Sequence, residues 1–245
     1  MSSWAVKRFW TEATVEQDED GFSIKLDGRG VKTPAKATLV VPTQAMAKAI
    51  ADEWQAQEGE VNPETMPVTR SANAAIDKVA FQHGEVADMI AEYGGSDLLC
   101  YRATQPEALI ARQAVAWDPM LSWAETVLGA KLRTISGVMH EPQDPESLKK
   151  LNRMVHGFSN FELAAFHDLV GLSGSLILGL AAVHEYRPIE ELWTLSRVDE
   201  NWQEEQWGHD EEASALAETK HMAFLHADRF FCMAKNSARS QLLDT

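Results

Sequence analysis

The sequence predicts an α+β protein, with a small antiparallel β-rich N-terminal domain followed by a larger, mainly α-helical C-terminal domain. Residues 22–26 alternate apolar and polar side chains and lead into an Asp-Gly turn, which indicates a hairpin. A linker-like connection with two prolines spans residues 58–67, and from Val68 onward the apolar spacing is mostly helical. We therefore expect one domain over residues 1–66 and a second over residues 67–245.

The N-terminal domain is expected to contain four strands and one helix. The strands are predicted at residues 8–15, 22–26, 31–34 and 39–41, where Pro42 ends the last one. Thr43 precedes a helical apolar series, so we expect it to cap a helix that ends before Gly59.

The C-terminal domain is expected to be a set of helices with two short strands. Helices are predicted at residues 72–79, 86–93, 106–128, 144–155, 161–180, from Pro188 into an acidic stretch, and 216–231; strands are predicted at 98–101 and 131–135. Pro119 should bend or break its helix. The tail from Asn236 is polar and is expected to fray.

Composition restricts the possible partners. The chain has 245 residues and a net charge of −15, which argues against binding nucleic acid or anionic lipid. The most apolar stretch, residues 169–183, is interrupted by glycines and is too short to span a bilayer, so we expect no membrane insertion. Two cysteines give no disulfide framework, which favours a reducing compartment.

The densest polar and aromatic stretch covers residues 197–212. Eight carboxylates and no basic residue lie between Arg197 and Lys220, and Trp202 and Trp207 stand among them. Unpaired carboxylates are too costly to bury, whereas tryptophans need a packing partner. We therefore expect an ordered acidic surface with aromatic anchors, suited to a partner that exposes Arg or Lys.

Three groups of residues are candidates for chemistry. Glu205, His209 and Glu212 have the spacing i, i+4, i+7 and would form a divalent-metal site if the helix were continuous and His167 with Asp168 assisted, but Gly208 interrupts it. Cys100 lies among apolar residues and is expected to be core rather than a nucleophile. The glycines of residues 171–175 are expected in helix packing, not in a nucleophile elbow.

A series of motifs runs in order over about residues 6–232, at residues 7–10, 22–29, 31–34, 39–43, 51–54, 67–70, 74–77, 93–102, 117–119 and 199–211. In these motifs the chain resembles the assembly chaperones of F-type ATP synthase that bind its alpha subunit. The resemblance implies no catalysis and no cofactor. It implies a role in keeping the unassembled alpha subunit soluble until beta subunits join.

The resemblance also implies which residues bind the client and in which compartment the protein acts. Glu211 falls at the family's functionally important acidic position, and the rest of that motif supplies the other expected contact residues, which are Asp199, Glu200, Gln203, Trp207 and Gly208. Glu212 and Ala213 follow where the family continues with an aromatic residue. We expect a cytoplasmic protein of the bacterial type, without a transit peptide and monomeric when free. The alternatives are a metal-dependent hydrolase built on Glu205, His209 and Glu212, or a generic acidic protein-binding scaffold.

Overall fold

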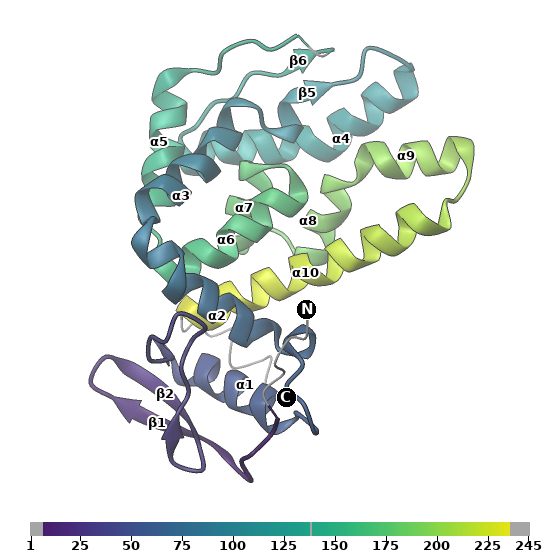
Figure 1. The fold of residues 1–245 in the computed structure, drawn as a ribbon. Helices are drawn as coiled ribbons and strands as arrows, with labels where there is room; N and C mark the ends of the chain where they lie inside the picture. Colours follow the sequence, from purple (N-terminus) through teal and green to yellow (C-terminus); the bar gives the residue numbers. More distant parts are fainter. Residues whose placement is uncertain (1–6, 138, 236–245) are drawn as a thin grey trace. The chain divides into compact units, whose positions relative to one another are not determined.

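A computed structural model describes residues 7–137 and 139–235 (Figure 1). These residues form two compact units: unit 1 comprises residues 7–82, 159–165 and 229–235, and unit 2 comprises residues 83–137, 139–158 and 166–228. Unit 1 contains an antiparallel sheet and unit 2 is mostly helical, which confirms the predicted α+β class. The units divide after Gln82, whereas the sequence places a domain boundary after residue 66; that boundary stays a prediction about folding domains.

The sheet of unit 1 is built around its second strand. β1 (Ala13–Asp18) and β2 (Gly21–Leu26) form an antiparallel hairpin, and β3 (Arg29–Gly30) and β4 (Val40–Val41) also pair with β2. A Cβ added to Gly21, which has φ +146°, would lie 2.4 Å from the Val41 carbonyl oxygen. Glycine is therefore required where β4 approaches β2. The predicted strand at 31–34 is replaced by a shorter one at β3.

The helix α1 (Gln44–Gln55) packs on this sheet and begins as predicted. The Thr43 hydroxyl accepts a hydrogen bond from the Met46 amide at 3.3 Å, so Thr43 is the N-cap. Glu53 of α1 accepts from the amides of Val68 (2.7 Å) and Thr69 (2.8 Å), which begin α2 (Pro67–Asp77). Burial raises the pKa of Glu53. These bonds satisfy two orphan donors at the start of α2.

Unit 2 is a helical assembly with a two-stranded ladder. Its elements are α3 (His83–Ala91), the 3-10 turns η3 (Glu92–Gly95) and η4 (Leu98–Cys100), β5 (Tyr101–Arg102), α4 (Glu107–Trp123), the π-helix η5 (Ala124–Leu128), β6 (Ile135–Ser136), α5 (Pro145–His156), α7 (Leu176–Val183), α8 (Ile189–Ser196) and α9 (Val198–Trp207). α6 (Asn160–Ser173) and α10 (Glu211–Lys235) contribute residues to both units. β5 and β6 are parallel.

The single long helix predicted over residues 161–180 is wrong. The chain breaks between α6 and α7 because Gly174 adopts φ +70° and Ser175 caps α7, accepting from the Leu178 amide at 3.0 Å. Gly179 lies inside α7 and does not break the helix. Close packing requires glycine there, since an added Cβ would lie 2.7 Å from Val170 Cγ2. The apolar character of both helices hides the break in the sequence.

Four smaller corrections concern local elements. α4 continues through Pro119, which is exposed, so the predicted break is absent. Most of the strand predicted at 98–101 is the turn η4, and the partner strand starts only at Ile135. The helix predicted from Pro188 stops at Ser196, and α9 starts anew after Arg197. The predictions for the tail from Asn236 and for residues 1–6 lie outside the described residues.

Candidate functional site

The acidic stretch of the sequence forms a corner between two helices. α9 ends at Trp207, and Gly208 turns the chain with φ +95° and ψ 169°, a conformation that favours glycine. Asp210 Oδ1 then accepts from the amides of Glu212 (2.9 Å) and Ala213 (3.1 Å), and so caps α10. Gly208 therefore ends the first helix and Asp210 begins the second. The capping role of Asp210 was not predicted from the sequence.

Most residues around this corner are exposed, and many of them are acidic. We call this part of the chain the acidic–aromatic surface, and it consists of Glu200, Gln203, Glu204, Glu205, Trp207, Gly208, Glu211 and Glu212. The side chain of Trp207 is 79% exposed. Trp202 is half-buried instead, with the Arg112 guanidinium 5.6 Å from its ring centroid. The two tryptophans therefore differ: Trp202 packs within unit 2 and Trp207 faces solvent.

The structure separates one predicted contact residue from the other five. Glu200, Gln203, Trp207, Gly208 and Glu211 are exposed, although Glu200 also pairs with Arg197 at 2.8 Å. Asp199 is half-buried and accepts from Gln113 Nε2 at 2.7 Å, and Gln113 in turn accepts from the Ala103 amide. Asp199 thus ties α9 to α4 and does not lie on the acidic–aromatic surface.

The metal-site hypothesis is wrong because its ligands are not brought together. Both oxygens of Glu205 accept from Arg112 at 2.7 Å, and His209 pairs with Glu204 beyond the end of α9. His167 hydrogen-bonds to its neighbour Asp168 at 2.9 Å, which raises the pKa of His167. Within residues 7–137 and 139–235, no three His, Cys, Asp or Glu side chains are grouped to hold a metal ion.

The other chemical candidates are structural. Cys100 is fully buried, and burial, with a contribution from Asp97, raises the pKa of its thiol to about 12. A thiol that stays protonated at neutral pH is a poor nucleophile. Residues 171–175 form the junction between α6 and α7 rather than a strand–turn–helix elbow.

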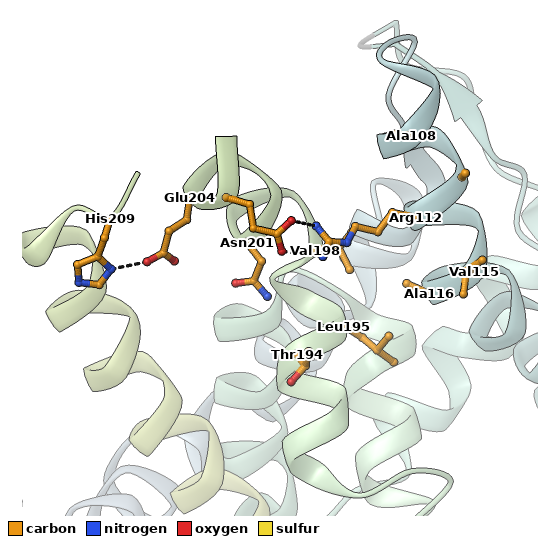
Figure 2. A pocket seen from close by; sticks show the side chains of 12 residues that line it. Ala108, Arg112, Val115, Ala116, Thr194, Leu195, Val198, Asn201, Glu204 and His209 are labelled. Atoms are coloured by element: carbon orange, nitrogen blue, oxygen red, sulfur yellow. Dashed lines mark hydrogen bonds and ion pairs between the residues drawn. The ribbon is translucent and has the colours of Figure 1, made fainter. Parts of the chain in front are cut away.

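A groove of about 840 Å³ lies beside the acidic–aromatic surface and was not predicted (Figure 2). We call it the α4–α9 groove; it is lined by Ala108, Ala111, Arg112, Val115, Ala116, Thr194, Leu195, Val198, Asn201, Glu204, Glu205 and His209. Figure 2 shows Arg112 reaching from α4 to a carboxylate of α9. The hydrogen bond from Arg112 lowers the pKa of Glu205. The three alanines of α4 and Val115 recur at helical spacing, and from the sequence alone this pattern predicts buried core positions.

Contacts behind the groove keep its walls in place. Trp117 is fully buried and its Nε1 donates to the Leu195 carbonyl at 2.8 Å, which joins α4 to α8. Gln113 holds α9 through Asp199 from the same helix. Both bonds lie within unit 2, so the groove is a feature of one compact unit.

Comparisons with known proteins agree with this architecture. The family model described as ATP12 chaperone protein matches residues 7–125. The crystal structure of Atp12 from Paracoccus denitrificans superposes with a TM-score of 0.92 at 47% identity, covering 95% of this chain and all of that one. A variant of that protein, with one aspartate replaced by lysine, superposes equally well.

Two further relatives extend the likeness. The Atu1473 protein of Agrobacterium tumefaciens, described as a putative chaperone, has a TM-score of 0.88 at 43% identity and covers 93% of this chain and 85% of its own. The mitochondrial protein atp12 of Schizosaccharomyces pombe is 24% identical over 222 residues, 86% of this chain and 76% of that protein.

Fold and relatives together define a chaperone and not an enzyme. The chain belongs to the ATP12 chaperone family, the family of ATP synthase assembly chaperones that the sequence resembles. Within the described residues, no helix combines the length and the apolar character needed to cross a membrane.

Proposed function

We propose that this chain binds the unassembled alpha subunit of F-type ATP synthase and prevents its aggregation until beta subunits join. The binding residues are those of the acidic–aromatic surface, with Trp207 and Glu211 at its centre. The chain acts as a monomer in the cytoplasm, a compartment supported by its bacterial relatives. The observation that carries the proposal is the exposed indole of Trp207 among carboxylates.

An exposed tryptophan of this kind is suited to a client contact. Indole buries a large apolar area and keeps one N–H donor, and tryptophan is enriched among residues that dominate binding energy. A subunit awaiting its neighbours exposes an apolar interface that aggregates. Trp207 can cover part of such an interface without a rearrangement of this chain, because its side chain is already 79% exposed.

The carboxylates around Trp207 support orientation of the client as it binds and its later release. Glu204, Glu205, Glu211 and Glu212 surround the corner, and the whole chain carries −15. Complementary charge speeds encounter with a basic surface but adds little affinity when it stays exposed to solvent. Such a contact holds a client while leaving it available to its permanent partner, and the net charge keeps the complex soluble.

The direct test is protection of the client. Purified alpha subunit, diluted from denaturant, should scatter less light when this chain is present at equimolar concentration without ATP. Unchanged scattering at that ratio rejects the proposed function. Bovine serum albumin at the same concentration controls for non-specific crowding.

A charge reversal tests the contact residues. Glu211→Lys should lower the affinity for alpha subunit by about tenfold, because it places a cation where the client's basic side chains approach. The matched control is Glu146→Lys, since Glu146 is also an exposed acid in the first turn of a helix, α5. Both substitutions incur the same unfavourable interaction with the helix dipole.

Isothermal titration with alpha subunit and circular dichroism decide the outcome together. The aspartate-to-lysine variant of the Paracoccus relative keeps its fold, which supports the use of charge reversal as a probe. Equal affinities for the Glu211→Lys and Glu146→Lys variants, both folded, would show that Glu211 is outside the contact.

A further inference from the structure

We propose that the α4–α9 groove receives an amphipathic helix of the client, with aliphatic side chains along one face and a lysine or arginine at its edge. The inference rests on the proposed function, because the client is the same alpha subunit. It adds a second, apolar contact beside the acidic–aromatic surface and specifies the kind of segment that is recognised.

The shape of the groove fits a helix. One wall is a face of α4 whose lining residues have the spacing i, i+3, i+4, i+7, i+8 from Ala108 to Ala116. The facing wall is formed by α9 from Val198 to Glu205, with the end of α8 between them. Each wall is about 12 Å long at 1.5 Å per residue. The groove therefore accommodates two to three turns of a partner helix.

Its apolar lining is shallow and open to solvent. Ala108, Ala111 and Ala116 leave space that larger residues would fill, and Val115 is 79% exposed at the edge. An amphipathic helix buries its apolar face against such a groove through anchors at i, i+3, i+4 and i+7. Aliphatic side chains of the client would cover Val115 and fill the space above the alanines.

Backbone chemistry favours a helix over an extended segment. All described lining residues belong to α4, α8, α9 and the turn after α9, so no strand edge borders the groove. An extended segment laid in it would bury amide and carbonyl groups without partners. A helix satisfies these groups internally and contributes only its side chains.

The charged residues that line the groove favour a basic helix. The net charge of the chain disfavours a second copy of this chain as the partner. Arg112 is the only Arg or Lys among the described lining residues, and Glu205 already holds it at 2.7 Å. Glu204 pairs with His209 and is half-exposed, so a client Lys or Arg can reach it by displacing the imidazole. A second copy of this chain would bring another −15 against the same acidic edge.

Two exposed valines of unit 2 provide a matched test. Val115 lines the groove, whereas Val127 of η5 is 60% exposed and lies outside it. The photo-crosslinking residue p-benzoylphenylalanine is placed at either position and the chain is irradiated with purified alpha subunit. Position 115 should give an adduct that maps by mass spectrometry to one amphipathic, Lys- or Arg-bearing segment, and position 127 should not give that adduct.

Affinity supplies the second readout. Val115→Asp should weaken alpha-subunit binding about tenfold, because the carboxylate must be desolvated in the bound complex. Val127→Asp should change it less than twofold, and both variants should keep the wild-type circular dichroism spectrum because both side chains are exposed.

The results separate this inference from the proposed function. If the chain protects alpha subunit from aggregation but Val115→Asp and Val127→Asp bind equally well, the groove does not hold the client and the inference is overturned. An adduct from position 115 that maps to an extended or acidic segment overturns it as well. If wild-type chain gives no protection, the proposed function fails first.

Discussion

Two regions of unit 2 use carboxylates in opposite ways. Asp97 is completely buried and accepts from the Ser175 hydroxyl (2.8 Å), the Leu99 amide (3.0 Å) and the Ile177 amide (3.0 Å). The acids of the acidic–aromatic surface are exposed, and Glu211 faces solvent in the first turn of α10. Asp97 therefore joins η4 to the start of α7, whereas Glu211 is available to a partner.

The pKa values follow the same division. Burial raises the pKa of Asp97 to about 6, although the surrounding donors act in the opposite direction. At the exposed Glu205 the hydrogen bond from Arg112 prevails and the pKa is lowered. Solvent access thus decides the direction in which each of these two pKa values moves.

The largest expected effect is on the buried side of this comparison. Asp97→Ala should lower the free energy of unfolding by roughly 3–5 kcal/mol, because it leaves the Ser175 hydroxyl and two buried amides without their acceptor. Urea denaturation measures the change. Glu141→Ala, at an exposed acid, is the control and should stay within about 0.5 kcal/mol of wild type. Similar losses in both variants would contradict the division between buried and exposed acids.

The second effect is on pH dependence. Because the folded pKa of Asp97 is about 6 and its ordinary value is 3.8, the part of the stability that comes from protonation of Asp97 is complete below about pH 4 and is lost as pH rises through 6. The full change is about 3 kcal/mol. Asp97→Asn cannot ionise, so the unfolding free energy of wild type minus that of the variant should fall by this amount between pH 4 and 7. A difference that is constant with pH would show that Asp97 is not a raised, buried acid.

The smallest effect on stability is expected at the exposed tryptophan. Trp207→Ala should change the free energy of unfolding by less than about 0.5 kcal/mol, yet weaken alpha-subunit binding about tenfold or more. Trp123→Ala is the contrasting variant, since Trp123 is 7% exposed and stacks on Tyr186 at 4.8 Å, and it should lose about 3–5 kcal/mol. Thermal denaturation and titration with alpha subunit measure the two quantities; a Trp207→Ala variant that unfolds would place Trp207 in the core.

Features with a local chemical cause could be predicted from the sequence. The N-cap at Thr43, the start of a helix at Asp144 and the interruption at Gly208 were all expected, and each depends on residues close by in the sequence. The break between α6 and α7 was missed because the apolar residues on both sides hide the local signals at Gly174 and Ser175, and because the buried acceptor Asp97, which also holds Ser175, lies 78 residues away. A run of apolar residues gives no sign of so distant an acceptor.

In the candidate site, too, local features could be predicted from the sequence and contacts between distant residues could not. Charge density predicted that residues around Trp207 are exposed, because eight carboxylates cannot be buried together. The α4–α9 groove depends instead on the pairing of Arg112 with Glu205, 93 residues apart. Ala108, Ala111 and Ala116 have the spacing of core positions, and only the arrangement of helices shows that they line an open wall.

The exposure of Trp207 has a spectroscopic consequence. Among residues 7–137 and 139–235 it is the one exposed tryptophan, and the others described are buried or half-buried. Indole emission shifts with the polarity of its surroundings, so Trp207 supplies the long-wavelength part of the fluorescence of the tryptophans in these described ranges. A partner that covers the corner between α9 and α10 removes water from it and moves that part of the spectrum to shorter wavelength. The chain thus carries an intrinsic optical reporter at the position where client contact is proposed.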